Sequence, residues 1–211
     1  MSNFESRLER AWNDDIVILC VGSSKVVGDS IGPRVGSALL HNDNFSKPVY
    51  GTMQNPVHSF NLDSTVEFIK VKHPNSLILA IDATISDKYR EGSLYFSEDG
   101  IKPGKGINKD LIKVGDMSIK AVVIRVNDFK QTDSKDLVKQ LHNISEGFVD
   151  KLVKRIVGAI IKASQKQLNE TLWISKVIGT CNDKGLKILN LNFEDRVVRV
   201  QRGKLIKDIK V

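Results

Sequence analysis

Two short apolar segments constrain the fold of this chain more than any other feature. Residues 15–21 and residues 76–82 each contain an unbroken run of apolar residues bounded by polar ones. Such runs are typical of central strands that are buried on both faces of a sheet. Apolar residues at helical spacing follow each of the first strands, at 31–40 and 62–69. The alternation of strands and helices predicts a three-layer α/β core with helices on both faces of the sheet.

Further elements follow the same logic along the rest of the chain. Shorter strands are expected at residues 48–50, 93–96 and 119–126. Between residues 148 and 161 the apolar side chains recur at the spacing of a long amphipathic helix. A shorter helix is expected near residues 137–141.

The C-terminal segment differs from the preceding chain in charge and in pattern. Residues 171–211 hold nine Lys or Arg against four Asp or Glu, a net +5 of the +7 carried by all 211 residues. Short strands are predicted at 173–178, 187–193, 196–201 and 205–210, with turns between them. We therefore expect two parts: an α/β domain at 1–170 and a small basic antiparallel β extension at 171–211.

Several classes of protein are disfavoured by the sequence. No segment approaches the roughly 18 consecutive apolar residues of a membrane span, and residues 1–15 lack the pattern of a secretory signal. Cys20 and Cys181 have no metal-like spacing, so we expect free thiols in a reducing cytoplasm. The basic tail has few interleaved aromatic residues, which argues against nucleic-acid binding. Its apolar side could pack on the long helix or on a second subunit, which leaves a homo-oligomer open.

Two carboxylates lie where α/β proteins place their ligands. Asp29 is in the loop after the first strand, between Gly28 and Gly32, and Asp82 ends the strand at 76–82. Because ligands bind beyond the carboxyl ends of parallel strands, we expect both acids to line one cleft. Two structural alternatives stay open: Asp29 could be a helix N-cap, and Asp82 could be a turn residue that closes its strand.

Two further segments carry groups that could contact a ligand. Residues 102–110 form a loop with two glycines and a proline, and Gly-rich backbone amides can bind an anion. His58 follows the short strand at 48–50. Asp29, His58 and Asp82 would be an acceptable ligand set for a divalent metal, but no recognised metal motif is present. We predict no resident cofactor and keep that metal site as an alternative.

Several blocks of sequence agree together in order and spacing between residues 16 and 126. These blocks are GDSIGP at 28–33, VYGT at 49–52, NPVH at 55–58, AIDA at 80–83, KPGKGINK at 102–109 and VGD at 114–116. In these blocks the chain resembles the YyaC-like sporulation proteins. That family is similar to the spore germination protease and, more distantly, to the hydrogenase maturation proteases.

The resemblance implies a phosphorylase/hydrolase-like α/β fold and a spore-associated peptidase that acts on a protein or peptide. It implies that Asp29 and Asp82 are the catalytic pair. Two adjacent carboxyl groups cannot both ionise easily, so one would activate water while the other, protonated, would polarise the scissile carbonyl. The substrate-binding candidates are His58, Gly104, Gly106, Asn108 and Lys109. A catalytically inactive binding or regulatory protein of sporulation on the same fold is the alternative.

Overall fold

The computed structural model describes residues 4–103, 113–127, 132–183, 188–193, 196–201 and 204–210. Side-chain surroundings are described as far as residue 166. The chain divides into two compact units, residues 1–164 and residues 165–211. The candidate site residues all belong to the first unit.

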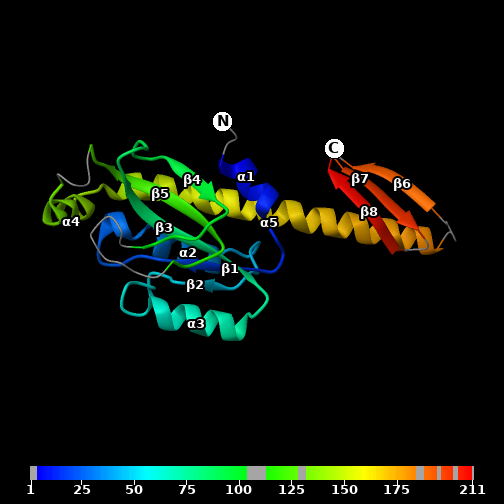
Figure 1. The fold of residues 1–211 in the computed structure, drawn as a ribbon, viewed down its shortest axis with the longest axis horizontal. Coiled ribbons are helices and arrows are strands. Elements are labelled where there is room, and N and C mark those ends of the chain that lie inside the picture. Colours follow the sequence, from blue (N-terminus) through cyan, green and yellow to red (C-terminus); the bar gives the residue numbers. More distant parts are fainter. Residues whose placement is uncertain are drawn as a thin grey trace. The chain divides into compact units, whose positions relative to one another are not determined.

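A five-stranded sheet forms the centre of the first unit (Figure 1). Its strands are β1 (Ile16–Cys20), β2 (Val49–Tyr50), β3 (Leu77–Ser86), β4 (Leu94–Ser97) and β5 (Met117–Arg125), in the order β2-β1-β3-β5-β4. The first four strands of that order run parallel, and β4 is antiparallel to β5. The two apolar runs therefore form neighbouring central strands, as the sequence predicts.

Helices cover both faces of this sheet, which confirms the three-layer α/β prediction. The helices of the first unit are α1 (Phe4–Ala11), α2 (Ile31–Leu40), α3 (Leu62–Lys72), α4 (Ser134–His142) and the first part of α5 (Glu146–Asp183). Apolar residues of α1, α2 and α5 belong to one buried cluster with one face of the sheet. The apolar residues of α3 belong to a second cluster on the opposite face.

Strand β1 shows why its sequence is apolar without interruption. Ile18 and Cys20 face the cluster that contains α2, whereas Val17 and Leu19 face the cluster that contains α3. All five residues of the strand are buried. Because both faces of a central parallel strand are covered, an alternating apolar and polar pattern would leave polar groups buried.

Two glycines of α2 allow the helix to approach the sheet closely. A Cβ atom at Gly32 would lie 2.1 Å from the carbonyl oxygen of Val21, and one at Gly36 would lie 1.9 Å from that of Gly51. Neither space admits a side chain. The glycines therefore fix α2 against the ends of β1 and β2, where the candidate site begins.

The second unit contains the end of α5 and an antiparallel meander of β6 (Ile188–Phe193), β7 (Arg196–Gln201) and β8 (Lys204–Lys210). The meander confirms the predicted β appendage. The predicted strand at 173–178 is wrong, because these residues continue α5. Extending an existing helix adds a hydrogen bond for each residue without a new nucleation step, and this outweighs the weak strand preference of Ile and Val. Within the described residues, no helix has the length and apolarity needed to cross a bilayer.

Candidate functional site

The loop after β1 holds Asp29 in a fixed position. Asp29 is the last residue of a short 3-10 helix, η1 (Val27–Asp29). One carboxylate oxygen, Oδ2, accepts a hydrogen bond of 2.9 Å from the backbone N–H of Ser23. Gly22 has a φ of +143°, and a Cβ atom there would lie 2.1 Å from the Asp29 carbonyl oxygen. The loop therefore closes on itself through a glycine beside Asp29.

The helix-cap interpretation of Asp29 is wrong. Ser30, not Asp29, occupies the N-cap position of α2, and no side chain caps the helix there. The Ser30 hydroxyl donates instead to the carbonyl oxygen of Val27, at 2.7 Å. The Asp29 carboxylate is thus not used to begin the helix, and it accepts instead from the Ser23 N–H within the loop.

The glycines on either side of Asp29 serve chain packing. A Cβ atom at Gly28 would lie 2.6 Å from Cδ1 of Ile144 and 2.9 Å from the carbonyl oxygen of Leu141. Gly28 therefore packs against the end of α4 and the residues that follow it, and Gly32 packs against β1.

Asp82 lies inside β3 and not at its end. The strand continues to Ser86, and Asp82 is in register with Lys120 of β5. The interpretation of Asp82 as a turn residue that closes the strand is therefore wrong. The residues after it, Thr84 and Ile85, favour extended structure and pair with β5. As a result, the carboxyl group projects from the sheet itself, which holds it more rigidly than a loop would.

The environment of Asp82 changes its acidity. Burial is the largest cause and raises its pKa well above the usual value, and the negative charge of Asp29 raises it further. The positive charge of Lys120 and a hydrogen bond from the Ala83 backbone N–H lower the pKa, but the net shift is upward. The two acids thus interact electrostatically, and Asp82 keeps its proton to a higher pH than an exposed aspartate does.

Two residues that the sequence analysis did not single out adjoin this acid pair. Asp82, Lys120 and Tyr95 form a row in register across β3, β5 and β4. The Lys120 Nζ lies 5.8 Å from the centroid of the Tyr95 ring. Burial is the largest cause that raises the pKa of Tyr95, and the charges of Tyr89 and Asp82 raise it further. A hydrogen bond with Thr84 lowers this pKa, but the net shift is upward. Lys120 interrupts the apolar residues 119–124 of β5, and this interruption was the available signal.

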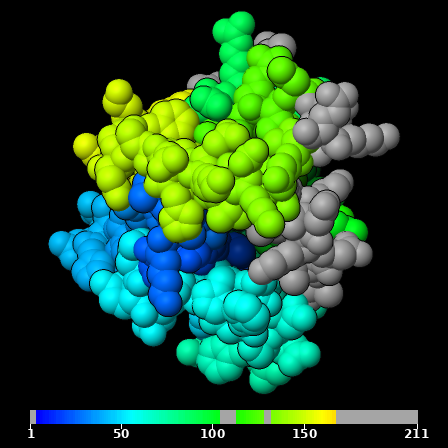
Figure 2. All heavy atoms as spheres, turned by 90° about the vertical axis from the view of Figure 1, so that its left-hand side faces the viewer, coloured from blue at the N-terminus to red at the C-terminus, as the bar shows by residue number. Residues whose placement is uncertain are grey.

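One face of the first unit shows the surface around the early part of the chain. Figure 2 views the first unit from the side on which α4 lies in Figure 1. Blue surface from the early part of the chain lies between the yellow-green surface of α4 and the start of α5 and the cyan surface that follows β2. The early part of the chain therefore reaches the surface between these two segments.

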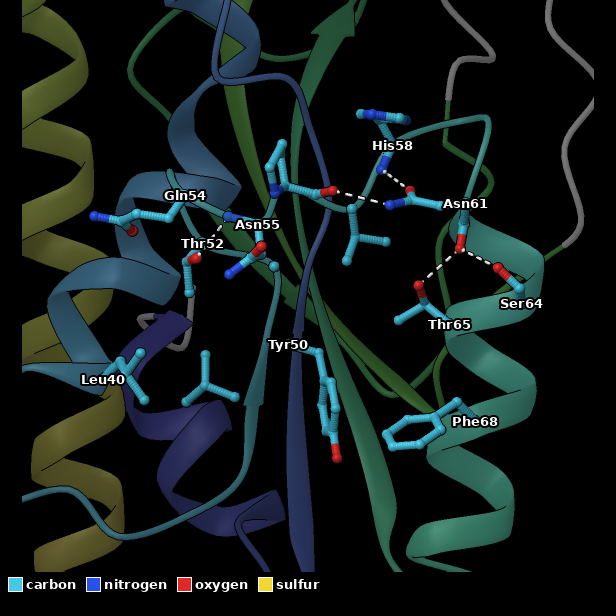
Figure 3. A pocket seen from close by; sticks show the side chains of 14 residues that line it. Leu40, Tyr50, Thr52, Gln54, Asn55, His58, Asn61, Ser64, Thr65 and Phe68 are labelled. Atoms are coloured by element: carbon cyan, nitrogen blue, oxygen red, sulfur yellow. Dashed lines mark hydrogen bonds between the residues drawn. The ribbon is translucent and has the colours of Figure 1, made fainter.

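His58 lies in a separate pocket between β2 and α3 (Figure 3). Its backbone N–H donates to Oδ1 of Asn61, at 2.8 Å, and its Nδ1 accepts from the N–H of Phe60, at 3.4 Å. Neither Asp29 nor Asp82 lines this pocket. Among the described residues, no three His, Cys, Asp or Glu side chains are grouped to hold a metal ion, so Asp29, His58 and Asp82 do not form one metal site.

Gly104, Gly106, Asn108 and Lys109 lie outside the described residues. The described flanks of their segment are joined by two backbone hydrogen bonds of 2.9 Å between Ile101 and Val114. Further along, the Asp116 carboxylate accepts a hydrogen bond of 2.8 Å from the N–H of Ile78. The VGD block at 114–116 therefore supports the start of β3.

Comparison with known proteins agrees with this fold. Residues 1–158 match the family described as protein of unknown function DUF1256. The chain belongs to this family. It is 36% identical over 118 residues to a protein of Bacillus subtilis (strain 168) named uncharacterized protein YyaC, which confirms the resemblance to YyaC. That alignment covers 56% of this chain and 58% of the relative.

Among solved structures, this DUF1256 chain is similar to a [NiFe] hydrogenase maturation protease, HycI, from Thermococcus kodakarensis KOD1. The match has a TM-score of 0.51 and covers 74% of this chain and 97% of that structure. At 15% sequence identity it establishes a shared fold, which is the peptidase-like α/β fold expected from the sequence.

Proposed function

We propose that this protein is a peptidase that cleaves a protein or peptide substrate with Asp29 and Asp82 as its catalytic pair. The observation that carries the proposal is the raised pKa of Asp82, caused by burial and by the charge of Asp29. Shifts of this kind, produced by desolvation together with a specific charged neighbour, are characteristic of catalytic acids. The fold shared with a hydrogenase maturation protease supports the assignment.

In this mechanism the two carboxyl groups have different roles. Protonated Asp82 donates a hydrogen bond to the scissile carbonyl oxygen, while ionised Asp29 accepts a proton from the attacking water. The water oxygen bonds to the carbonyl carbon, and the carbonyl oxygen becomes the oxyanion of a tetrahedral intermediate. When the C–N bond breaks, the leaving nitrogen takes up the proton held by Asp29. Lys120, opposite Asp82 on β5, would stabilise the negative charge.

Substrate contacts and biological setting belong to the same proposal. Asn108 and the backbone amides of Gly104 and Gly106 would stabilise the oxyanion, and Lys109 and His58 would bind the substrate chain. The motif blocks shared with the YyaC-like proteins support a cytoplasmic role in sporulation. If that role holds, deletion of the gene in its spore-forming host should change spore yield or germination without changing vegetative growth.

The direct test is cleavage of a library of internally quenched peptides. Asp29→Asn and Asp82→Asn should each reduce kcat/KM by about 100-fold or more, the usual range for general acid–base groups. Asp99→Asn is a matched control, because Asp99 is an exposed carboxylate paired with Lys113. Full activity in either catalytic variant, with the fold intact by circular dichroism, would contradict the mechanism.

A binding or regulatory protein on the same fold is the second candidate. One observation favours it: the pocket between β2 and α3 is lined by neither acid of the pair. If wild type cleaves no peptide while that pocket binds one, this second function holds and the peptidase fails.

A further inference from the structure

The pocket between β2 and α3 is distinguished by the absence of charge among its described lining residues. It is an open groove with a volume of about 670 Å³, within the range of typical ligand sites, and fourteen residues line it (Figure 3). None of the fourteen is Asp, Glu, Lys or Arg, although such residues make up 27% of the chain. The lining itself offers a charged occupant no ion-pair partner, which favours an uncharged one. The Nζ of Lys72, which is not a lining residue, lies 5.5 Å from the centroid of the Phe68 ring.

One end of the pocket is apolar and firmly held. The rings of Tyr50 and Phe68 are 6.0 Å apart in an edge-to-face arrangement. The Tyr50 hydroxyl is 2.9 Å from Nε2 of His73, and this hydrogen bond holds the Tyr50 ring in place. Leu40 also lines the pocket and is 61% exposed, and Phe68 is 53% exposed. These surfaces suit an aliphatic or aromatic side chain that would cover them.

The other end is polar, and its shape is set by its own hydrogen bonds. Nδ2 of Asn61 donates to the carbonyl oxygen of Pro56 at 3.1 Å, and its Oδ1 accepts from the N–H of His58. Thr52 and Asn55 exchange two further bonds, of 3.0 and 3.1 Å. The exposed Asn55 side chain lines the pocket on this rigid loop (Figure 3). A side-chain amide offers both a donor and an acceptor, which matches a peptide main chain.

The pocket adjoins the loop that carries Asp29. Val57 lines the pocket and bridges to Val21, and its carbonyl oxygen accepts a 2.8 Å hydrogen bond from the N–H of Gly22. Gly22 in turn packs against the carbonyl oxygen of Asp29. A chain bound in the pocket could therefore continue along this edge of the sheet to the acid pair.

We propose that this pocket binds an uncharged segment of the protein substrate, with one aliphatic or aromatic side chain seated between Leu40, Tyr50 and Phe68. Asn55 bonds the main chain of that segment. The inference rests on the proposed peptidase function and adds its specificity: the enzyme selects substrates by an apolar residue near the cleaved bond.

The test is a titration of the isotope-labelled full-length chain followed by backbone amide chemical shifts. The probes are N-acetyl-leucinamide and N-acetyl-phenylalaninamide, compared with the N-acetylated amides of glutamate and lysine. The apolar probes should give saturable shifts at residues 51–58 and 61–68, with at least about tenfold tighter binding than the charged probes. Because these probes are too short to be cleaved, binding is measured apart from catalysis.

Two variants and a matched control sharpen the result. Phe68→Ser should weaken binding of the apolar probes by about fivefold or more. Val71→Ser is the matched control, because Val71 lies on the same helix, is 83% exposed and does not line the pocket. Leu40→Lys places a charge at an exposed wall position and should shift preference toward the glutamate probe. Melting temperatures of all three should stay close to wild type.

Three results would overturn the proposal: no shifts at the pocket, equal affinity for charged probes, or equal loss in the Phe68 and Val71 variants. Failure here is distinguishable from failure of the peptidase. Cleavage that depends on Asp82 without binding at the pocket removes only the pocket. Binding at the pocket in a wild-type protein that cleaves nothing removes the peptidase and its specificity, and leaves the pocket as a binding site for an uncharged segment.

Discussion

Two halves of one face of β3 differ sharply in character. Ile78 and Ala80 are 5% and 0% exposed and share a buried apolar cluster with Leu62 of α3. Asp82, two residues further along and on the same face, stands opposite Lys120 and within electrostatic reach of Asp29. Successive side chains on one face of a strand are two residues apart, so the change from core to polar site occurs within a single repeat.

The difference shows that neighbours, and not the strand itself, decide what a position tolerates. The apolar half is covered by α3, whose buried residues exclude water from Ala80. The polar half meets charged and hydroxylated side chains of β5 and β4. The folded state therefore tolerates an acid at position 82 and should not tolerate one at position 80. Substitutions can test this contrast.

The largest effect on stability is expected from placing a second acid on this face, two residues before Asp82. Ala80→Asp would bury a carboxylate without a partner, and uncompensated buried charges cost about 3–5 kcal/mol. The site is also tightly packed, since a Cβ atom at Gly115 would lie 2.9 Å from the Ala80 Cβ. Chemical denaturation should show this loss in the free energy of unfolding at neutral pH.

Ala80→Asn separates crowding from charge in that experiment. It adds nearly the same volume as Asp and should cost about 1–3 kcal/mol through overpacking, with a further loss from a buried amide that lacks hydrogen-bond partners. The difference in the free energy of unfolding between Ala80→Asp and Ala80→Asn should decrease at low pH, where the Asp is protonated. Equal stability of Ala80→Asp and wild type would show that the two halves of the face do not differ as described.

A smaller effect, of opposite sign, is expected from Asp82→Asn. An unfolded aspartate ionises near pH 3.9, whereas burial and Asp29 raise the pKa of folded Asp82. The folded state binds more protons between these two pKa values, so wild-type stability falls as pH rises through that window. Asn cannot ionise, so the free energy of unfolding of the variant should increase relative to that of wild type from about pH 4 upward. Each unit of raised pKa corresponds to about 1.4 kcal/mol.

The control for this pH series is Asp99→Asn. A hydrogen bond from Lys113 is the main cause that lowers the pKa of Asp99. Its contribution to stability is therefore present at neutral pH and lost as pH falls through its folded pKa. Asp99→Asn should leave stability unchanged or slightly lower at neutral pH. A gain in this variant equal to that of Asp82→Asn would mean that the effect reflects net charge and not the site.

The sequence predicted those parts of the molecule that depend on local pattern. The unbroken apolar runs identified β1 and β3, because a strand covered on both faces admits no polar alternation. The position of Asp29 after β1 was likewise visible. The length of β3 beyond Asp82 was not, because it depends on pairing with β5. Residues 173–178 have strand-forming composition but continue a helix that begins nearly thirty residues earlier.

The site residues that were missed depend on register between distant strands. Lys120 and Tyr95 come close to Asp82 only because β5 lies between β3 and β4 with a particular alignment. The uncharged pocket was also invisible, since its walls come from α2, β2 and α3. No local pattern in a single sequence encodes such cross-strand neighbours.

The smallest effect concerns Lys120, which opposes the two causes that raise the pKa of Asp82. Burial and Asp29 outweigh the lysine, so its removal should raise that pKa further but by less than either cause already does. Lys120→Met keeps the length of the side chain and removes its charge. The titration midpoint of the Asp82 carboxyl carbon signal, followed by NMR across pH, should move to higher pH.

Lys113→Met serves as the control, because Lys113 pairs with Asp99 and is not among the groups that shift the pKa of Asp82. It should raise the pKa of Asp99 and leave that of Asp82 in place. If Lys120→Met leaves the Asp82 midpoint unchanged, the row across the three strands is a structural alignment without electrostatic coupling, and the polar half of this face reduces to the two acids alone.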